Sequence, residues 1–277
     1  MNLSRLFVIA GILLMLFMSS CSSYQKLLKS DDNERKFEQA IAYYEAGKYG
    51  RTIALLSDII PHFRGTSRAE TINYYYAWAH YKFGDYTMAS FYFRSFANAF
   101  PQSEHAEEFF FMSAYCKYLE SPRPNLDQTV TMEAIRDLQS FINRFPSSER
   151  VEEANNLIDE LRSKLETKRF EKALMYMRIS DFIAANTTFE NLIRDFPDTQ
   201  YREQALFQMI QSHFNYASRS IPQRQIERFE DTLTAYRRFV RFFPDSELMP
   251  RAERLRQSTE QQLAMLRASL EESATTN

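Results

Sequence analysis

A short motif, Phe-Pro-x-Ser/Thr, recurs along this chain and constrains its fold more than any other feature. Proline restricts the residue before it and cannot continue a helical hydrogen-bond ladder, so each copy predicts the end of a helix. The Asp, Ser or Thr that follows is suited to cap the next helix. The chain is therefore predicted to be an array of helix hairpins. The copies are Phe100–Ser103, Phe145–Ser148, Phe196–Thr199 and Phe243–Ser246, with a degenerate fifth copy at Phe63–Thr66.

A constant spacing supports the array. In each unit a small residue opens the second helix, and the closing position lies twelve residues later, as from Ala89 to Pro101. The same interval separates Thr52 from Arg64, Ala134 from Pro146, Ala185 from Pro197, and Thr232 from Pro244. One such interval would be weak evidence, but five of them predict five hairpins.

The second unit, from Glu70 to Pro101, carries the fullest pattern. Gly84 permits a tight turn between two helices, and the small Ala77 and Ala89 allow those helices to approach closely. This unit resembles a tetratricopeptide (TPR) repeat. The predicted fold is all-α: a right-handed α-solenoid of five TPR-like helix hairpins plus a C-terminal capping helix that covers the open end.

The N-terminus has the features of a lipoprotein signal peptide. The apolar run from Leu6 to Met18 is too short for a membrane span but fits a secretory segment. Met18-Ser19-Ser20-Cys21 resembles the lipobox of bacterial lipoproteins, so we expect Cys21 to be acylated. The alternative is an ordinary cleaved signal followed by a chance cysteine. The expected organisation is a signal peptide (1–20), an acylated, disordered tether (21–30), three repeats (31–146), two repeats with the capping helix (147–270) and a disordered tail (271–277).

The composition argues against catalysis and against nucleic-acid binding. The formal net charge is −2, and only five glycines are present, which leaves little room for phosphate-binding loops. No nucleophile elbow, Walker loop or dinucleotide-binding signature occurs. No histidine has a metal-binding spacing, and Cys116 has no obvious activating base. We therefore expect a protein that is not an enzyme and that uses no metal or cofactor.

Aromatic residues on the first helices are the better lead to function. In TPR units the ligand groove is lined by first-helix positions two, five, nine, twelve and thirteen. Tyrosine and tryptophan combine an apolar body with a polar group, which suits extended peptides of varied sequence. The alternative is that these rings pack between neighbouring repeats. The resulting candidate peptide-binding residues are Phe37, Tyr44, Tyr74, Trp78, Tyr81 and Lys82.

Taken together, lipobox, tether, five repeats and closing helix resemble the BamD family of outer-membrane lipoproteins. Phrases such as Phe63-Arg64-Gly65-Thr66, Ser121-Pro122-Arg123-Pro124 and Phe145-Pro146-Ser147-Ser148 strengthen the resemblance. It implies a lipid-anchored protein on the periplasmic face of the outer membrane. The implied partners are the POTRA domains of BamA, held by the C-terminal repeats, and C-terminal segments of unfolded outer-membrane proteins, received by the N-terminal repeats.

Two other functions compete with this interpretation. A generic periplasmic TPR lipoprotein that scaffolds cell-wall or division enzymes would share the same composition. A helical-solenoid enzyme of the cell wall would need a separate catalytic domain, and no segment outside the repeats is long enough for one.

Overall fold

The computed structural model describes residues 23–275 and contains helices but no strands over that range. The chain divides into two compact units. Unit 1 contains Met1–Pro122 and Gln128–Leu161, and unit 2 contains Arg123–Asp127 and Arg162–Asn277. The predicted fold class is confirmed, because the described residues form five successive helix hairpins followed by a closing helix.

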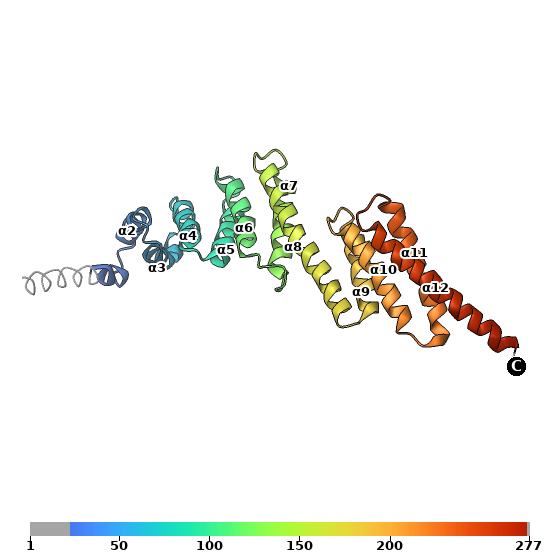
Figure 1. Ribbon diagram of the computed structural model, residues 1–277. Helices are drawn as coiled ribbons and strands as arrows, with labels where there is room; N and C mark the ends of the chain where they lie inside the picture. Colours follow the sequence, from blue (N-terminus) through green and yellow to red (C-terminus); the bar gives the residue numbers. More distant parts are fainter. Residues whose placement is uncertain (1–22, 276–277) are drawn as a thin grey trace, which may run out of the picture. The chain divides into compact units, whose positions relative to one another are not determined.

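In unit 1, each helix from α2 to α6 packs against the next one along the chain (Figure 1). Its core is dominated by phenylalanine, with Phe93, Phe109 and Phe141 fully buried. The elements are α2 (Asn33–Glu45), α3 (Tyr49–Ile59), the 3₁₀ turn η1 (Ile60–Phe63), α4 (Ala69–Phe83), α5 (Tyr86–Ala99), α6 (Ala106–Glu120), α7 (Thr129–Arg144) and the first part of α8 (Val151–Arg178).

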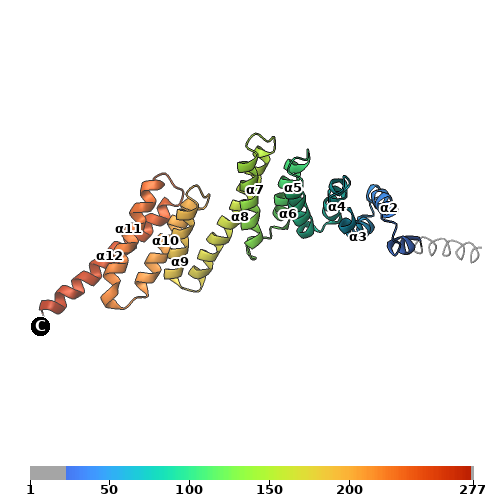
Figure 2. The same cartoon turned by 180° about the vertical axis from the view of Figure 1, so that it is seen from behind.

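In unit 2, the remainder of α8 pairs with α9, and the Phe170 and Phe189 rings meet at 5.8 Å between these two helices. Seen from behind in Figure 2, α9 to α12 lie side by side, and each contacts the next. The elements are α9 (Phe182–Asp195), α10 (Arg202–Ser218), α11 (Pro222–Phe242) and α12 (Met249–Thr275).

The predicted spacing is confirmed by burial. The small residues that open the five second helices are all completely buried: Thr52, Ala89, Ala134, Ala185 and Thr232. Seven residues further along each helix a large apolar side chain is also buried: Ile59, Phe96, Phe141, Leu192 and Phe239. The small residue lets the two helices approach closely, and the large side chain fills the space between them about two turns later. These two contacts together fix the geometry of each hairpin.

The turn inside three of the hairpins needs a left-handed residue. Gly47 (φ 71°) and Gly84 (φ 87°) supply it without strain, because glycine has no Cβ. Ser180 takes the same position in the fourth hairpin with φ 62°. The Asp85 and Asp181 side chains then cap the second helices by accepting hydrogen bonds from the backbone N–H groups of Met88 and Ala184.

The recurring Phe-Pro motif ends helices as predicted, but its Ser or Thr does not cap the next helix. Helix α6 begins after His105, and no side chain caps it. Instead, Ser103 Oγ accepts a hydrogen bond from the N–H of His105, two residues on. Ser148, Thr199 and Ser246 make the same bond. The prediction was wrong because the chain makes a further turn before the helix starts.

The expected disordered tether is also wrong over its described part. Residues 23–28 are helical, and Tyr24, Leu27 and Leu28 pack against the first hairpin. Ser30 Oγ donates to the carbonyl of Leu27 and closes this short helix. The segment is ordered because its apolar side chains are partly buried against the apolar faces of α2 and α3.

At the other end, α12 covers α10 and α11 as the predicted capping helix. Leu263 is buried against Phe229, and Leu266 packs beside them. The helix continues to Thr275, so residues 271–275 are helical where the sequence analysis expects a disordered tail.

Candidate functional site

Aromatic side chains occupy equivalent positions on the first helices of three successive hairpins in unit 1. Corresponding residues lie 37 positions apart, as Tyr44, Tyr81 and Tyr118 do. All of them except Phe111 are partly exposed. We call this set the aromatic stripe: Phe37, Ile41 and Tyr44 on α2, Tyr74, Trp78 and Tyr81 on α4, and Phe111, Tyr115 and Tyr118 on α6.

The centre of the stripe is on α4, where Trp78 contacts rings on both sides. Its ring centroid lies 6.4 Å from that of Tyr74 and 5.5 Å from that of Tyr81. It also meets Phe93 at 5.1 Å and Phe109 at 6.1 Å. These side chains are therefore fixed by packing against the next hairpin while part of each ring stays accessible. Packing and exposure, which the sequence left as alternatives, occur together.

The stripe is continuous from the first hairpin to the second. Tyr44 meets Tyr75 at 5.1 Å, and Tyr75 meets Tyr74 at 5.4 Å, with edge-to-face geometry at both contacts. Phe37 lies apart from this chain of rings and contacts the Arg68 guanidinium at 5.4 Å. The structure thus brings Tyr44, Tyr74, Trp78 and Tyr81 together and leaves Phe37 at the margin.

The third hairpin extends the stripe. Phe111, Tyr115 and Tyr118 stack in sequence with centroid separations of 5.9 and 5.7 Å. The Tyr118 hydroxyl donates a hydrogen bond to the Glu160 carboxylate at 2.5 Å. These residues were not among the predicted ones, although adding 37 to Tyr74, Trp78 and Tyr81 identifies them. Tyr75 and Phe109 lie outside the position rule, and nothing in the sequence marked them.

Burial and nearby charge keep the stripe phenols neutral. Burial, with smaller effects from neighbouring tyrosines, raises the pKa of Tyr44 to about 12. Burial first, and then the Glu108 carboxylate, raises the pKa of Tyr74. The hydrogen bond to Glu160 raises the pKa of Tyr118 to about 12. The hydroxyl groups of Tyr44 and Tyr74 therefore stay protonated at neutral pH, and that of Tyr118 stays protonated while it donates to Glu160.

One polar atom in the stripe lacks a regular hydrogen bond. The indole Nε1 of Trp78 is buried, and its interaction with the Tyr74 hydroxyl, which opposes the burial-driven rise in the pKa of that phenol, falls short of regular hydrogen-bond geometry. Leaving a buried donor unpaired costs about 1–3 kcal/mol, so such atoms are rare outside functional sites. Lys82, the remaining candidate, lies with its Nζ 6.0 Å from the Trp78 ring.

The other residues considered for chemistry do not form a reactive centre. Burial raises the pKa of Cys116 to about 12, which makes its thiol unreactive. Burial lowers the pKa of His80, an effect that its Asp85 partner opposes. Over residues 23–275 no group of His, Cys, Asp and Glu side chains could hold a metal ion.

No helix in that range is long and apolar enough to cross a membrane. Cys21, the predicted acylation site, lies outside the described residues.

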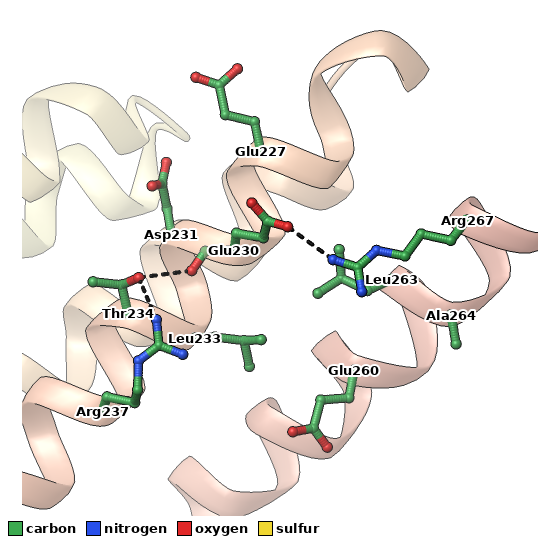
Figure 3. A pocket seen from close by; sticks show the side chains of 10 residues that line it. All are labelled: Glu227, Glu230, Asp231, Leu233, Thr234, Arg237, Glu260, Leu263, Ala264 and Arg267. Carbon is green, nitrogen blue, oxygen red and sulfur yellow. Dashed lines mark hydrogen bonds and ion pairs between the residues drawn. The ribbon is translucent and has the colours of Figure 1, made fainter. Parts of the chain in front are cut away.

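A hollow of about 620 Å³ between α11 and α12 is a second surface that could bind a partner (Figure 3). Four acidic and two basic residues line it, and most of these charges are already paired. Glu230 pairs with Arg267 at 2.9 Å across the hollow, and Glu227 pairs with Arg224 at 3.0 Å. Such neutralised charge offers little attraction to a ligand, so the aromatic stripe remains the candidate site.

Comparisons with known proteins identify a family, a curated relative and a solved structure to which this chain is similar. A family model described as "YfiO: Outer membrane lipoprotein" matches residues 29–224. The outer membrane protein assembly factor BamD of Caulobacter vibrioides is 25% identical over 136 residues, which cover 49% of this chain and 45% of the relative. The chain thus spans about half the length of this curated relative. The crystal structure of the P58(IPK) TPR domain aligns with a TM-score of 0.39 and 13% identity, over 90% of this chain and 68% of that one. Because the family model covers well over half of the sequence, this chain belongs to the YfiO family of outer membrane lipoproteins.

Proposed function

We propose that this protein is a non-enzymatic subunit of the outer-membrane β-barrel assembly machinery, anchored by a lipid at Cys21 on the periplasmic face. In this role it binds the POTRA domains of BamA and receives C-terminal segments of unfolded outer-membrane proteins. Family membership and the similarity to a BamD protein support the general role.

The observation that carries the proposal is the aromatic stripe of unit 1. Extended peptides present alternating side chains and unpaired backbone groups. The half-buried rings of the stripe offer apolar surfaces for those side chains. The stripe is held rigid by Phe93 and Phe109, so little side-chain entropy is lost on binding.

The direct test replaces the centre of the stripe. Tyr74→Ala combined with Trp78→Ala should weaken binding of a peptide matching a barrel C-terminus by at least roughly tenfold, about 1.4 kcal/mol. Phe91→Ala is the matched control, because Phe91 is an exposed ring on α5 outside the stripe. Unchanged affinity in the double variant would exclude the stripe as the binding site.

Because both rings pack against Phe109, the double variant also loses stability. Trp78→Phe separates the two effects, since it keeps an aromatic ring and removes only the indole N–H and part of the ring area. It should weaken peptide binding while leaving the free energy of unfolding within about 1 kcal/mol of the parent. A fall in stability without a fall in affinity would assign Trp78 to packing alone.

The partner and the anchor need separate tests. Purification of the protein from detergent-solubilised membranes should recover a POTRA-containing barrel; recovery of cell-wall or division enzymes in its place would favour the scaffold interpretation. Cys21→Ala should release the protein from membranes that lack BamA. Retention of that variant would place the anchor elsewhere.

A further inference from the structure

An open hollow lies beside the turn between α2 and α3, at the end of α4. Its volume is about 430 Å³. Three basic side chains line it, Lys48, Arg51 and Lys82, and the rings of Tyr49 and Phe83 lie between them. Gly47 of the turn and Gly50 of α3 complete the lining, and none of its residues is acidic. We call it the basic–aromatic hollow.

Phe83 is unusual within this hollow because its side chain is 62% exposed. The ring lies over the α3 backbone, since a Cβ added to Gly50 would meet Phe83 at 3.4 Å. An exposed phenylalanine surrounded by lysine and arginine is the side-chain combination that membrane-surface segments use. The ring enters the boundary between headgroups and acyl chains, and the cations meet the lipid phosphates.

The N-terminal segment is fixed beside the same hollow. The Arg51 guanidinium lies 5.0 Å from the Tyr24 ring centroid and 5.4 Å from that of Tyr43. The two rings meet edge-to-face at 5.9 Å, and Lys48 Nζ lies 5.8 Å from Tyr43. Arg51 therefore both lines the hollow and holds the helix of residues 23–28, which starts two positions after Cys21.

We propose that the basic–aromatic hollow is a membrane-docking face that rests on an anionic phospholipid surface. A lipid at Cys21 would place the bilayer within two residues of the helix of residues 23–28, which packs beside the hollow. The first hairpin would therefore be held close to the bilayer. The occupant is a phospholipid because the hollow combines phosphate-binding cations with an exposed apolar ring. The inference rests on the proposed acylation of Cys21, and its test keeps the two claims apart.

The test measures how close two matched positions lie to the bilayer. The acylated full-length mature chain carries a dye at Phe83→Cys or at Phe91→Cys, in vesicles of phosphatidylethanolamine and phosphatidylglycerol with a headgroup-labelled quencher lipid. Phe83 and Phe91 are 62% and 61% exposed, and only Phe83 lines the hollow. Cys116 is buried with a raised pKa, so it stays unlabelled. We expect quenching at position 83 to exceed that at position 91 several-fold; equal quenching would overturn the proposal.

Tyr24→Ala, which frees the N-terminal segment, should reduce the difference between the two positions. Mass spectrometry of the same preparation reports the lipid on Cys21. An unmodified cysteine would refute the anchor of the proposed function, whereas an acylated chain with equal quenching would refute only the docking face.

Vesicle sedimentation of the mature chain with Cys21→Ser tests the hollow without the anchor. Lys48→Glu should weaken binding to phosphatidylglycerol vesicles by more than about fivefold, because each basic residue near an anionic surface contributes roughly 1 kcal/mol to binding. Arg136→Glu is the control, an exposed basic side chain on α7 outside the hollow. Equal losses in the two variants, or complete competition by millimolar inorganic phosphate, would overturn the assignment to a lipid surface.

Discussion

The first helices of unit 1 and unit 2 have the same framework but different surface chemistry. In unit 1 the stripe positions of α4 carry Tyr74, Trp78 and Tyr81. When the two left-handed turn residues Gly84 and Ser180 are aligned, the equivalent positions of α8 carry Phe170, Leu174 and Met177. Aligning the starts of α4 and α10 places Phe207, Gln211 and Phe214 there. At the compared positions, rings that carry a polar group therefore occur in unit 1 and not in unit 2.

Both units carry ion pairs between helices, as Lys117 of α6 pairs with Glu133 of α7 in unit 1. In unit 2, Arg169 of α8 pairs with Asp195 of α9, and Arg238 of α11 pairs with Glu190 of α9. Exposed pairs contribute little stability, and paired charges do not distinguish the two units. The units therefore differ in the aromatic side chains at the stripe positions, and the proposal that unit 1 receives extended chains rests on that difference.

The largest effect is expected from matched cavities in the two cores. Phe93→Ala and Phe189→Ala each remove a fully buried ring four positions after the small residue of its hairpin. Each should lower the free energy of unfolding by about 3–5 kcal/mol. Because hairpins contact mainly their neighbours, the loss should stay within the mutated unit. Hydrogen exchange measured by mass spectrometry can follow both units at once, and equal loss of protection in both would contradict their separation.

A smaller effect is expected from the left-handed turns. Gly84→Ala places a Cβ at φ 87° and should cost about 1–2 kcal/mol. Ser180→Gly removes the same strain from unit 2 but also removes the 2.6 Å hydrogen bond that Arg219 donates to Ser180 Oγ. A net gain of roughly 0.5 kcal/mol is expected. Urea unfolding of the two variants gives both values, and stabilisation by Gly84→Ala would refute the turn assignment.

The smallest effects concern pH. Burial raises the folded-state pKa of Tyr44 from 10.0 to about 12. Its contribution to the stability of the folded state is therefore complete below pH 10 and is lost as the pH rises toward 12. Hydrogen bonds from Arg256 and Tyr236 lower the pKa of Glu253 from 4.5 to about 2. Its contribution to the stability of the folded state is therefore present above pH 4.5 and is lost as the pH falls toward 2. Thermal melts should show that Tyr44→Phe weakens the alkaline dependence only, and that Arg256→Gln weakens the acid dependence only. The reverse pattern would contradict these assignments.

Regular features of the fold were predictable because they depend on local chemistry. Phenylalanine before proline ended each helix, and the twelve-residue interval located the five buried small residues. The capping role of Ser103 was mispredicted because the start of α6 depends on a further turn that the motif does not encode. The docked N-terminal helix depends on Tyr24 meeting Arg51, a contact between residues distant in the sequence that no local pattern reveals.

The candidate site was predictable in part for the same reason. Position rules identified Tyr74, Trp78 and Tyr81, since these follow the helical repeat. They could not identify Tyr75 or Phe109, which join the stripe through packing between hairpins. They also could not separate Phe37, whose position fits the rule while its ring contacts Arg68.

The central claim is that unit 1 receives extended peptides on the aromatic stripe, and Trp78 reports on it directly because it is the only tryptophan in the chain. A peptide that lacks tryptophan and ends in an aromatic residue, as barrel C-termini do, should produce a saturable change in Trp78 emission. The change should follow the binding curve measured independently by anisotropy of a labelled copy of the peptide. A scrambled peptide should leave the emission unchanged. Tight binding by anisotropy with no change in Trp78 emission would contradict the account.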